Sequence, residues 1–494
     1  MLRGLLSFRD PYRILNYAWF AFFLTFVVWF NYAPFVTTIR ETMGLSVEQS
    51  RTISLCNLAL TIPARIIIGM VLDRFGPRLT YSALLVYAAV PTLAFAFAQN
   101  FNQLVLSRLA LSIVGAGFVV GIRLVAEWFP SKQIGLAQGI YGGWGNFGSF
   151  AAEALLPLLA TGAAFLAVGQ TNWRLAIALT GIISAVYGVY FYFNVQDTPP
   201  GTVYQQPAKD GGMEVTSAKS FWALIASSFP LFCTMGLITW RLSLVKFLSS
   251  STLYIIWVAL IGFFLLQSYK TWDVNRDVVS GKKTYPPNER YKMGQVMVLN
   301  LAYAVSFGSE LAVVSMLPEF FEHTFNIGHN IAGPIAASYP LMNLVSRPAG
   351  GFISDKIGSR KWTLTALIGG VGIGYLIMSQ ISNGWLMTIS IAVTMFCAFF
   401  VFGAAGATFG IAPLLKRSIT GQITGNIGAY GSVGSVIYAT AYSLLPPTTA
   451  GNQIFFQFLG CSALVVFFLC AFLLEEPVQF STEEIKEDPA FSGH

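Results

Sequence analysis

Residues 62–78 read IPARIIIGMVLDRFGPR, an apolar helical run that carries one charged residue, Arg65, before it ends in a charged turn. The pattern returns at residues 345–361 as VSRPAGGFISDKIGSRK. In both copies an aspartate follows the arginine by eight residues, and the two copies are offset by 282 positions. A duplicated apolar helix with the same charged loop predicts a chain built from two related halves.

The two repeated arginines, Arg65 and Arg347, are expected near the middle of a membrane. Eight residues of helix rise about 12 Å, and the apolar core of a bilayer is about 30 Å thick. A cation at that depth costs at least ~3 kcal/mol and is by default a functional-site hypothesis. Two such cations, related by the repeat, predict a central anion site.

Composition agrees with a membrane protein. The chain has 494 residues, of which 55% are hydrophobic and only 10% are charged, whereas soluble domains are about 25% charged. Many apolar runs reach the ~20 residues that span a bilayer, and the period-two alternation of a β-barrel is absent. The sequence therefore predicts an all-α polytopic membrane protein. It carries no nucleic-acid signature, and its first apolar run has no cleavage site, so we interpret it as an uncleaved span.

The cysteines and histidines give no sign of a metal site. All five cysteines lie within apolar segments and lack metal-ligand spacing, so they are interpreted as small buried hydrophobes. His323 and His329 share one loop, and the third histidine is the last residue. We predict no metal and no cofactor.

The apolar runs predict six spans in each half, with two further runs between the halves. In the first half they cover about 16–38, 52–72, 79–98, 104–126, 134–160 and 174–194. In the second half they cover about 294–317, 330–353, 363–381, 385–408, 421–446 and 453–474. The predicted domains are an N-terminal bundle at 1–200, a linker with the inserted pair at 201–292, a C-terminal bundle at 293–475 and an acidic cytoplasmic tail at 476–494, disordered from Glu475 onward. For the inserted pair we favour crossing the bilayer over a hairpin that lies on its surface.

Orientation follows from the positive charges in the loops. In the second half, the loops after Asp355 and around Lys416–Arg417 are basic, whereas the alternate loops at 318–329, 381–385 and 446–452 contain no lysine or arginine. Basic loops face the cytoplasm. The prediction is a multi-pass protein of the cell membrane with both termini in the cytoplasm.

The repeated loops, GMVLDRFGPR and GGFISDKIGSRK, resemble the signature loop of the major facilitator superfamily. That resemblance implies two six-helix bundles, here with an inserted two-helix hairpin. It gives the loops a gating and structural role rather than substrate contact. The gating candidates are Asp73, Arg74, Asp355, Arg123 and Glu127. Each aspartate can cap a neighbouring helix or pair with a basic residue such as Arg123.

Two glycine-rich stretches, YGGWGNFGSFAAEA at 141–154 and ITGNIGAYGSVGSV at 423–436, each contain Gly-Asn-x-Gly. Glycines at helical spacing let backbones approach closely, whereas Asn146 and Asn426 can donate N–H to an anion without adding charge. Together with the two arginines, these stretches resemble the nitrate/nitrite porter family of the major facilitator superfamily, including its plant-type permeases.

The resemblance implies nitrate or nitrite bound between the halves. It assigns substrate contact to Arg65 and Arg347, to the aromatics Phe118 and Phe307 that sandwich the anion, and to Tyr303, Asn146 and Asn426. Physical chemistry agrees, because a guanidinium offers a planar fork of donors to a planar oxyanion. The alternative to a role in substrate binding is that an arginine only forms a structural ion pair with an acidic residue.

Two acids are proton-coupling candidates. Glu310 follows Phe307 by three residues, and Glu153 follows Asn146 by seven, so each shares a helix face with a predicted site residue. A carboxyl group in a low-dielectric cleft binds protons more readily and could carry a coupling proton. The alternative for Glu310 is a structural pair with Arg65, Arg347 or Arg108.

The sequence thus predicts a nitrate, and also nitrite, transporter that works by alternating access, with proton-coupled uptake and no enzymatic activity. We expect a monomer whose partners are the small anion, protons and the bilayer. The rivals left open are a nitrate/nitrite exchanger without proton coupling, a sensor on a transporter fold, an organophosphate:phosphate antiporter and a membrane enzyme. The antiporter would carry a dianion and would need an additional lysine or histidine at the midplane, which the sequence lacks. A membrane enzyme would need a set of catalytic residues at one depth, which the sequence does not show.

Overall fold

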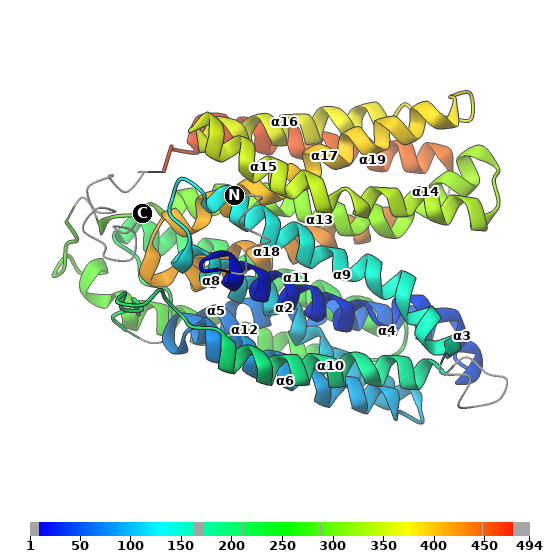
Figure 1. Ribbon diagram of the computed structural model, residues 1–494, viewed down its shortest axis with the longest axis horizontal. Helices are drawn as coiled ribbons and strands as arrows, with labels where there is room; N and C mark the ends of the chain where they lie inside the picture. The colour runs from blue at the N-terminus through cyan, green and yellow to red at the C-terminus, as the bar shows by residue number, and fades with distance from the viewer. Residues whose placement is uncertain (1–8, 163–171, 210, 287–288, 447, 478–494) are drawn as a thin grey trace.

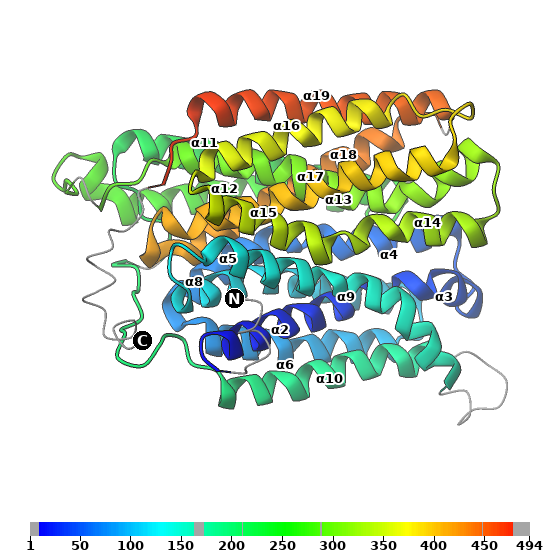
Figure 2. The ribbon, with the colours of Figure 1, turned by 45° about the horizontal axis from the view of Figure 1, so that its top comes forward.

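The computed structural model describes residues 9–162, 172–209, 211–286, 289–446 and 448–477. Within these residues all regular structure is helical, and the helices run roughly along the long axis of the molecule (Figure 1). In Figure 2 the helices of the second half of the chain lie above those of the first half. Of the tail predicted at 476–494, residues 478–494 lie outside the described residues.

The first half of the chain forms a bundle of long rods, several of which are interrupted. Its elements are α2 (Tyr12–Phe30), η1 (Ala33–Phe35), α3 (Val36–Thr42), α4 (Val47–Ala59), α5 (Thr61–Phe75), α6 (Pro77–Ala96), α7 (Phe101–Leu111), η2 (Ser112–Ala116), α8 (Gly117–Trp128), α9 (Ile134–Gly162) and α10 (Trp173–Asn194).

The inserted pair consists of two continuous helices, and the second half then follows the same plan as the first. Their elements are α11 (Ala218–Leu244), α12 (Ser250–Val279), α13 (Met293–Phe325), α14 (His329–Leu341), α15 (Asn343–Ile357), α16 (Arg360–Met378), α17 (Met387–Ile411), η5 (Ala412–Leu414), η6 (Arg417–Ile419), α18 (Thr420–Ser443) and α19 (Thr449–Leu473). Each of the twelve predicted spans in the two halves falls on one helix or on a run of two or three consecutive helices, and most of the bounds agree to within a few residues. The largest difference is in α13, which continues to Phe325 although the predicted span ends at 317.

Eleven of the described rods are long and apolar enough to cross a membrane, and α11 and α12 are both among them. The rods α9, α14 with α15, and α18 are not in this set; they contain the glycine-rich stretches or several prolines. The structure therefore confirms an all-helical fold whose helices are long enough to span a membrane. The arrangement of twelve spans plus an inserted pair stays a prediction.

Glycines bring the two halves into close contact. A Cβ atom on Gly69 of α5 would lie 2.5 Å from the carbonyl oxygen of Gly421 on α18. A Cβ on Gly139 of α9 would lie 2.5 Å from the carbonyl oxygen of Arg347 on α15. These positions need glycine, because any side chain would push the helices apart. Each contact joins one half of the chain to the other.

Helix interruptions expose backbone groups in the interior. The rod that includes α4 and α5 breaks at Leu60, and the rod that includes α7 and α8 contains the 3-10 segment η2. The rod of α14 and α15 breaks at Met342, two residues after Pro340. Interrupted helices inside a membrane protein leave carbonyl groups free to bind polar side chains or ions.

The beginning of the C-terminal tail is ordered. The carboxylate of Glu476 accepts hydrogen bonds from the backbone N–H groups of Arg360 at 2.6 Å and Lys361 at 3.1 Å. It therefore caps the N-terminus of α16, where a negative charge is stabilising. Glu475 forms an ion pair with Lys292 at 2.5 Å. The prediction of disorder from Glu475 onward is thus wrong for these first two residues.

Candidate functional site

The two repeated arginines meet in the interior. Arg65 on α5 and Arg347 on α15 are 0% and 1% exposed. Both guanidinium groups lie over the ring of Phe307 on α13, with Cζ to centroid distances of 5.3 Å for Arg65 and 5.9 Å for Arg347. The structure thus places one predicted arginine from each half beside the same predicted aromatic ring.

Arg65 is held by neutral oxygen atoms. Its Nε donates to the carbonyl oxygen of Gly115 in η2 at 3.2 Å. Its Nη1 donates to the carbonyl oxygen of Gly428 and to the hydroxyl of Ser432, the latter at 3.1 Å, both on α18. Its Nη2 is buried and has no hydrogen-bond partner among the described residues. One arm of this guanidinium is therefore unsatisfied.

Arg347 is held by a carboxylate. Its Nη2 donates to Oε2 of Glu310 at 2.9 Å, and Asn343 donates to Oε1 of the same carboxylate at 3.2 Å. With the Asn146 amide turned so that its oxygen faces the guanidinium, Oδ1 accepts from Nη1 at 3.0 Å and from Nη2 at 2.7 Å. Of the three arginine partners open to Glu310 from sequence, the structure selects Arg347.

The predicted aromatic residues form one stack. Tyr303 is parallel to Phe307, with centroids 5.0 Å apart, and parallel to Phe118, with centroids 6.1 Å apart. Phe409 of α17 meets Phe118 and Tyr303 edge-on, at 4.7 Å from each. All of these rings are buried. Tyr303 therefore stacks on both of the aromatic residues that were predicted to sandwich the anion.

Two predicted residues lie apart from this cluster. The amide oxygen of Asn426 accepts from Nδ2 of Asn300 at 2.7 Å, and Asn426 lines a lateral cavity. Glu153 is exposed and forms no hydrogen bond or ion pair with the rest of the described chain. It lies two helical turns beyond Asn146 on α9, toward the end of the bundle opposite Asp73.

The two repeated aspartates interlock the halves at one end of the molecule. Asp73 at the end of α5 accepts from the backbone N–H groups of Gly421 at 2.8 Å and Gln422 at 2.9 Å, at the start of α18. Asp355 near the end of α15 accepts from the N–H groups of Gly135 at 3.0 Å and Leu136 at 2.7 Å, at the start of α9. Each carboxylate thus caps a helix of the other half, where its charge complements the helix dipole.

Further contacts close the same end, which we call the Asp73 end. Arg123 pairs with Glu127 at 2.8 Å, and among the described residues it forms no direct ion pair with Asp73. Glu127 also pairs with Arg417 of the other half at 2.8 Å. Arg74 donates to the side chain of Gln206, in the linker, at 3.4 Å. The gating candidates therefore gather at one end, separated from the arginine pair.

Arg108 belongs to neither the site nor the interlock. Its guanidinium donates to Asn31 at 2.9 Å and to the carbonyl oxygen of Trp29 at 2.5 Å, and it lies over the ring of Tyr32. These partners all come from the first half of the chain. Arg108 thus joins α7 to the end of α2.

Sequence reasoning missed three contributors. Asn343 lies four residues before Arg347 on the same helix face, a signal visible in the sequence. Ser432 lies inside the glycine-rich stretch, six residues after Asn426, and nothing in its spacing marks it. The carbonyl of Gly115 becomes available only because η2 interrupts the rod of α7 and α8. Among the described residues, no group of three or more His, Cys, Asp or Glu side chains could hold a metal ion.

These observations define a multi-pass helical membrane protein with a buried pair of cations between two related halves. A family model described as Major Facilitator Superfamily matches residues 18–272 and 299–491. The chain belongs to this superfamily.

Comparison with individual relatives identifies a more specific group within the superfamily. The chain is 58% identical to the nitrate/nitrite transporter NrtP of Nostoc punctiforme, over 97% of this chain and 95% of that protein. It is 54% identical to the nitrate/nitrite transporter NrtP of a Picosynechococcus species, with the same coverage. These relatives confirm the resemblance to nitrate/nitrite porters.

A solved structure supports the fold alone. The proton:xylose symporter XylE of the same superfamily superposes with a TM-score of 0.63 at 14% identity, covering 95% of this chain and 97% of that chain.

Proposed function

We propose that this protein transports nitrate and nitrite across the cell membrane by alternating access, with the anion bound between Arg65 and Arg347. The observation that carries the proposal is the unpartnered Nη2 of Arg65, buried in the interior beside a second arginine. An unsatisfied buried donor costs about 1–3 kcal/mol, more when it is charged. The relatives named as nitrate/nitrite transporters support the same substrate.

The chemistry of the site suits a small planar monoanion. A guanidinium fork can donate two parallel hydrogen bonds to two oxygens of such an ion. Phe307 offers a flat apolar surface beside both guanidinium groups and its ring edge carries partial positive charge. The surrounding side chains are buried, so an anion here is shielded from water and its attraction to the arginines is strengthened.

Glu310 supplies a way to couple the anion to a proton. While its carboxylate is ionised, Arg347 is neutralised by it and only Arg65 carries an unpaired charge. Protonation of Glu310 removes that ion pair and frees the Arg347 guanidinium for the anion. Nitrate and Glu310 thus compete for Arg347, so anion binding and proton binding favour each other.

The driving force requires more than one proton for each anion. Each charge moved is worth ~2.3 kcal/mol per 100 mV, so uptake with two protons is assisted by a negative-inside potential. Glu310 accounts for one carboxyl group. Glu153, exposed on the same face of α9 as Asn146, is the second candidate and lies toward the end where a proton from outside would enter.

The helix caps that Asp73 and Asp355 form between the two halves identify one gate of the transporter. We assign the Asp73 end to the cytoplasm, because the basic loops lie there, and both termini to the same side. In this conformation the caps made by Asp73 and Asp355 close the route to the cytoplasm. Release of the anion then needs both helix caps to open as the halves rock about the site.

Flux through proteoliposomes that contain a pH-sensitive dye tests the proposal. We expect an inward nitrate gradient to drive nitrate entry and acidify the lumen, with nitrite accepted as an alternative substrate. Absence of nitrate and nitrite flux in protein that is folded by gel filtration would overturn the proposal. Nitrate/nitrite exchange without acidification would retain the substrate and replace symport by exchange.

A further inference from the structure

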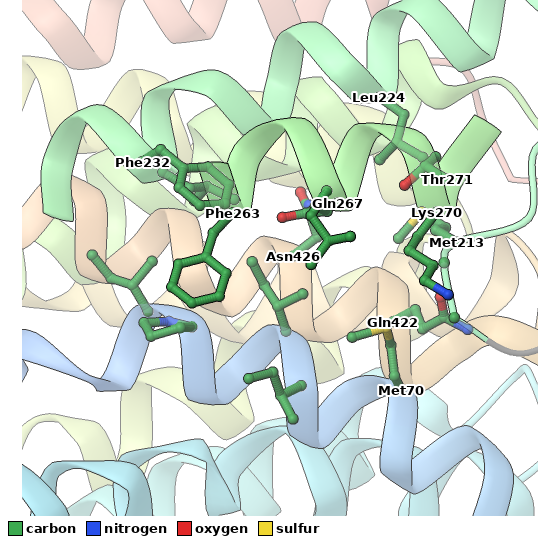
Figure 3. Close-up of a pocket in the computed structure, with 18 of the residues that line it drawn as sticks. Met70, Met213, Leu224, Phe232, Phe263, Gln267, Lys270, Thr271, Gln422 and Asn426 are labelled. Carbon is green, nitrogen blue, oxygen red and sulfur yellow. The ribbon is translucent and has the colours of Figure 1, made fainter. Parts of the chain in front are cut away.

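A lateral cavity of about 430 Å³ lies outside the arginine site (Figure 3). It is bounded by α5 and α18 on one side and by the inserted helices α11 and α12 on the other, and residues 211–213 of the linker close one end. α12 packs mainly against α11, which leaves this space between the inserted pair and the core. No part of the proposed transport cycle uses the cavity.

The lining of the cavity changes along its length. At the Asp73 end it presents Lys270, Thr271 and Gln422, together with the backbone of the linker glycines. Figure 3 shows Phe232 and Phe263 at the opposite end, with Gln267 between the two groups. The wall is therefore polar and cationic at one end and apolar at the other.

The cavity opens on the outer surface of the bundle. Ile67 of α5 and Phe263 of α12, which line it, are 53% and 61% exposed. In a membrane-spanning region this surface faces acyl chains. Water does not fill a space with mostly apolar walls, and an empty space would forfeit dispersion contacts with its lining.

The cation at the polar end is available to a ligand. Lys270 is exposed, and its ammonium makes no hydrogen bond or ion pair with any other described residue. The wall around it is fixed, because Asn275 of α12 accepts from the N–H of Val215 at 2.7 Å and donates to the carbonyl of Met213 at 2.9 Å. These bonds attach the linker to α12 next to Lys270.

We propose that the cavity binds one anionic phospholipid, with an acyl chain between α5 and α12 and the phosphate beside Lys270. A bilayer places a lipid phosphate at the membrane surface and its chain toward the midplane, which matches the polar and apolar ends of the wall. Lysines next to the bilayer attract anionic head groups. With about 30 Å³ for a group the size of water, the cavity holds a chain segment on the order of ten carbons.

The bound lipid would support the helices that form the site. α5 carries Arg65, and α18 carries Ser432, which binds Arg65. Filling the space behind these helices keeps their outer faces packed. The proposal does not depend on nitrate being the substrate, since lipid binding is measured without any anion gradient.

Native mass spectrometry of the full-length protein tests the proposal. The detergent-solubilised protein is titrated with palmitoyl-oleoyl phosphatidylglycerol or, separately, with the phosphatidylcholine of the same chains. We expect one high-affinity adduct with the phosphatidylglycerol. Lys270→Gln should weaken that adduct about fivefold and remove the preference over phosphatidylcholine, whereas Lys270→Arg should retain it.

The matched control is Lys219→Gln, an exposed lysine near the same end of α11 that does not line the cavity. An equal loss in this control would mean general surface attraction and would overturn the site. Ile67→Trp, at the open side, should reduce binding of both lipids while the gel-filtration profile stays normal; unchanged binding would exclude the cavity as the chain site. Competition by glycerol phosphate at the same concentration as the lipid would show that the acyl chain contributes nothing to binding, which also contradicts the proposal.

Discussion

The two halves of the molecule supply the same residue to the site and hold it differently. Arg347 has a carboxylate partner, Glu310, and an amide partner, Asn146. Arg65 has only carbonyl and hydroxyl oxygens, and one of its arms has no partner among the described residues. A duplicated pair has thus become one neutralised cation and one unpaired cation.

This difference gives the site a net charge of one rather than two when Glu310 is ionised. A single unpaired cation matches a monoanion, because the anion removes the remaining charge. Two unpaired guanidinium groups would repel each other in a low-dielectric interior. The asymmetry also separates two tasks, since Arg65 can bind the anion directly while Arg347 links the anion to a proton.

The largest expected effect on nitrate affinity comes from replacing the guanidinium of Arg65 by an ammonium. Arg65→Lys keeps the charge but removes the planar pair of donors. Loss of charge-assisted hydrogen bonds worth about 1.5–3 kcal/mol should weaken nitrate binding by roughly 10- to 100-fold, measured by calorimetry on purified protein. Arg347→Lys should weaken it less at neutral pH, because Glu310 already engages that side chain.

Arg108→Lys is the matched control for this pair of variants. Arg108 is equally buried but binds Trp29 and Asn31 rather than the site. We expect a lower yield of folded protein with nitrate affinity unchanged. Equal losses of affinity in Arg65→Lys and Arg347→Lys, across the pH range, would contradict the division of tasks between the two arginines.

Much of this site could be predicted from the sequence. The length of the apolar runs and the repeated arginine–aspartate spacing indicate a two-halved helical bundle with two central cations. The sequence could not decide whether Asp73 caps a helix or forms an ion pair, because the answer depends on how the two halves pack. Glu310 had three possible arginine partners, and helix rotation decides among them.

Other features need the folded backbone. Asn426 matches Asn146 in its local sequence, yet it binds Asn300 while Asn146 faces Arg347. The position of Tyr303 between two predicted contacts depends on ring orientation. The carbonyl of Gly115 is free to bind Arg65 because of a 3-10 segment, and although Gly115 and Gly117 mark a weak point in this helix, they do not reveal which carbonyl becomes available. Such details follow from packing between distant segments, which local patterns do not encode.

A second, smaller effect is expected from Glu310→Gln, which removes the charge that neutralises Arg347 while keeping the shape of the side chain. Proton-driven accumulation of nitrate should be lost, because the position no longer binds or releases a proton. Nitrate/nitrite exchange should persist at a reduced rate. Flux measured with a pH-sensitive dye separates the two activities.

Glu319→Gln serves as the control for this variant, since Glu319 lies on the same helix α13 but is exposed. It should retain both accumulation and exchange. Unchanged acidification by nitrate in Glu310→Gln would remove Glu310 as a proton carrier and leave its ion pair with Arg347 as a structural contact.

The smallest effect is expected from Ser432→Ala, which deletes one of the neutral contacts that orient Arg65. The guanidinium keeps its bonds to Gly115 and Gly428, so only one hydrogen bond worth about 1 kcal/mol is lost, and nitrate affinity should fall about fivefold. The pH dependence of binding should not change, because the proton-linked contacts belong to Arg347. Ser435→Ala, a buried serine three residues further along α18, should leave affinity unchanged. A change in pH dependence in Ser432→Ala would mean that the two halves of the site are coupled through Phe307 rather than separate in their tasks.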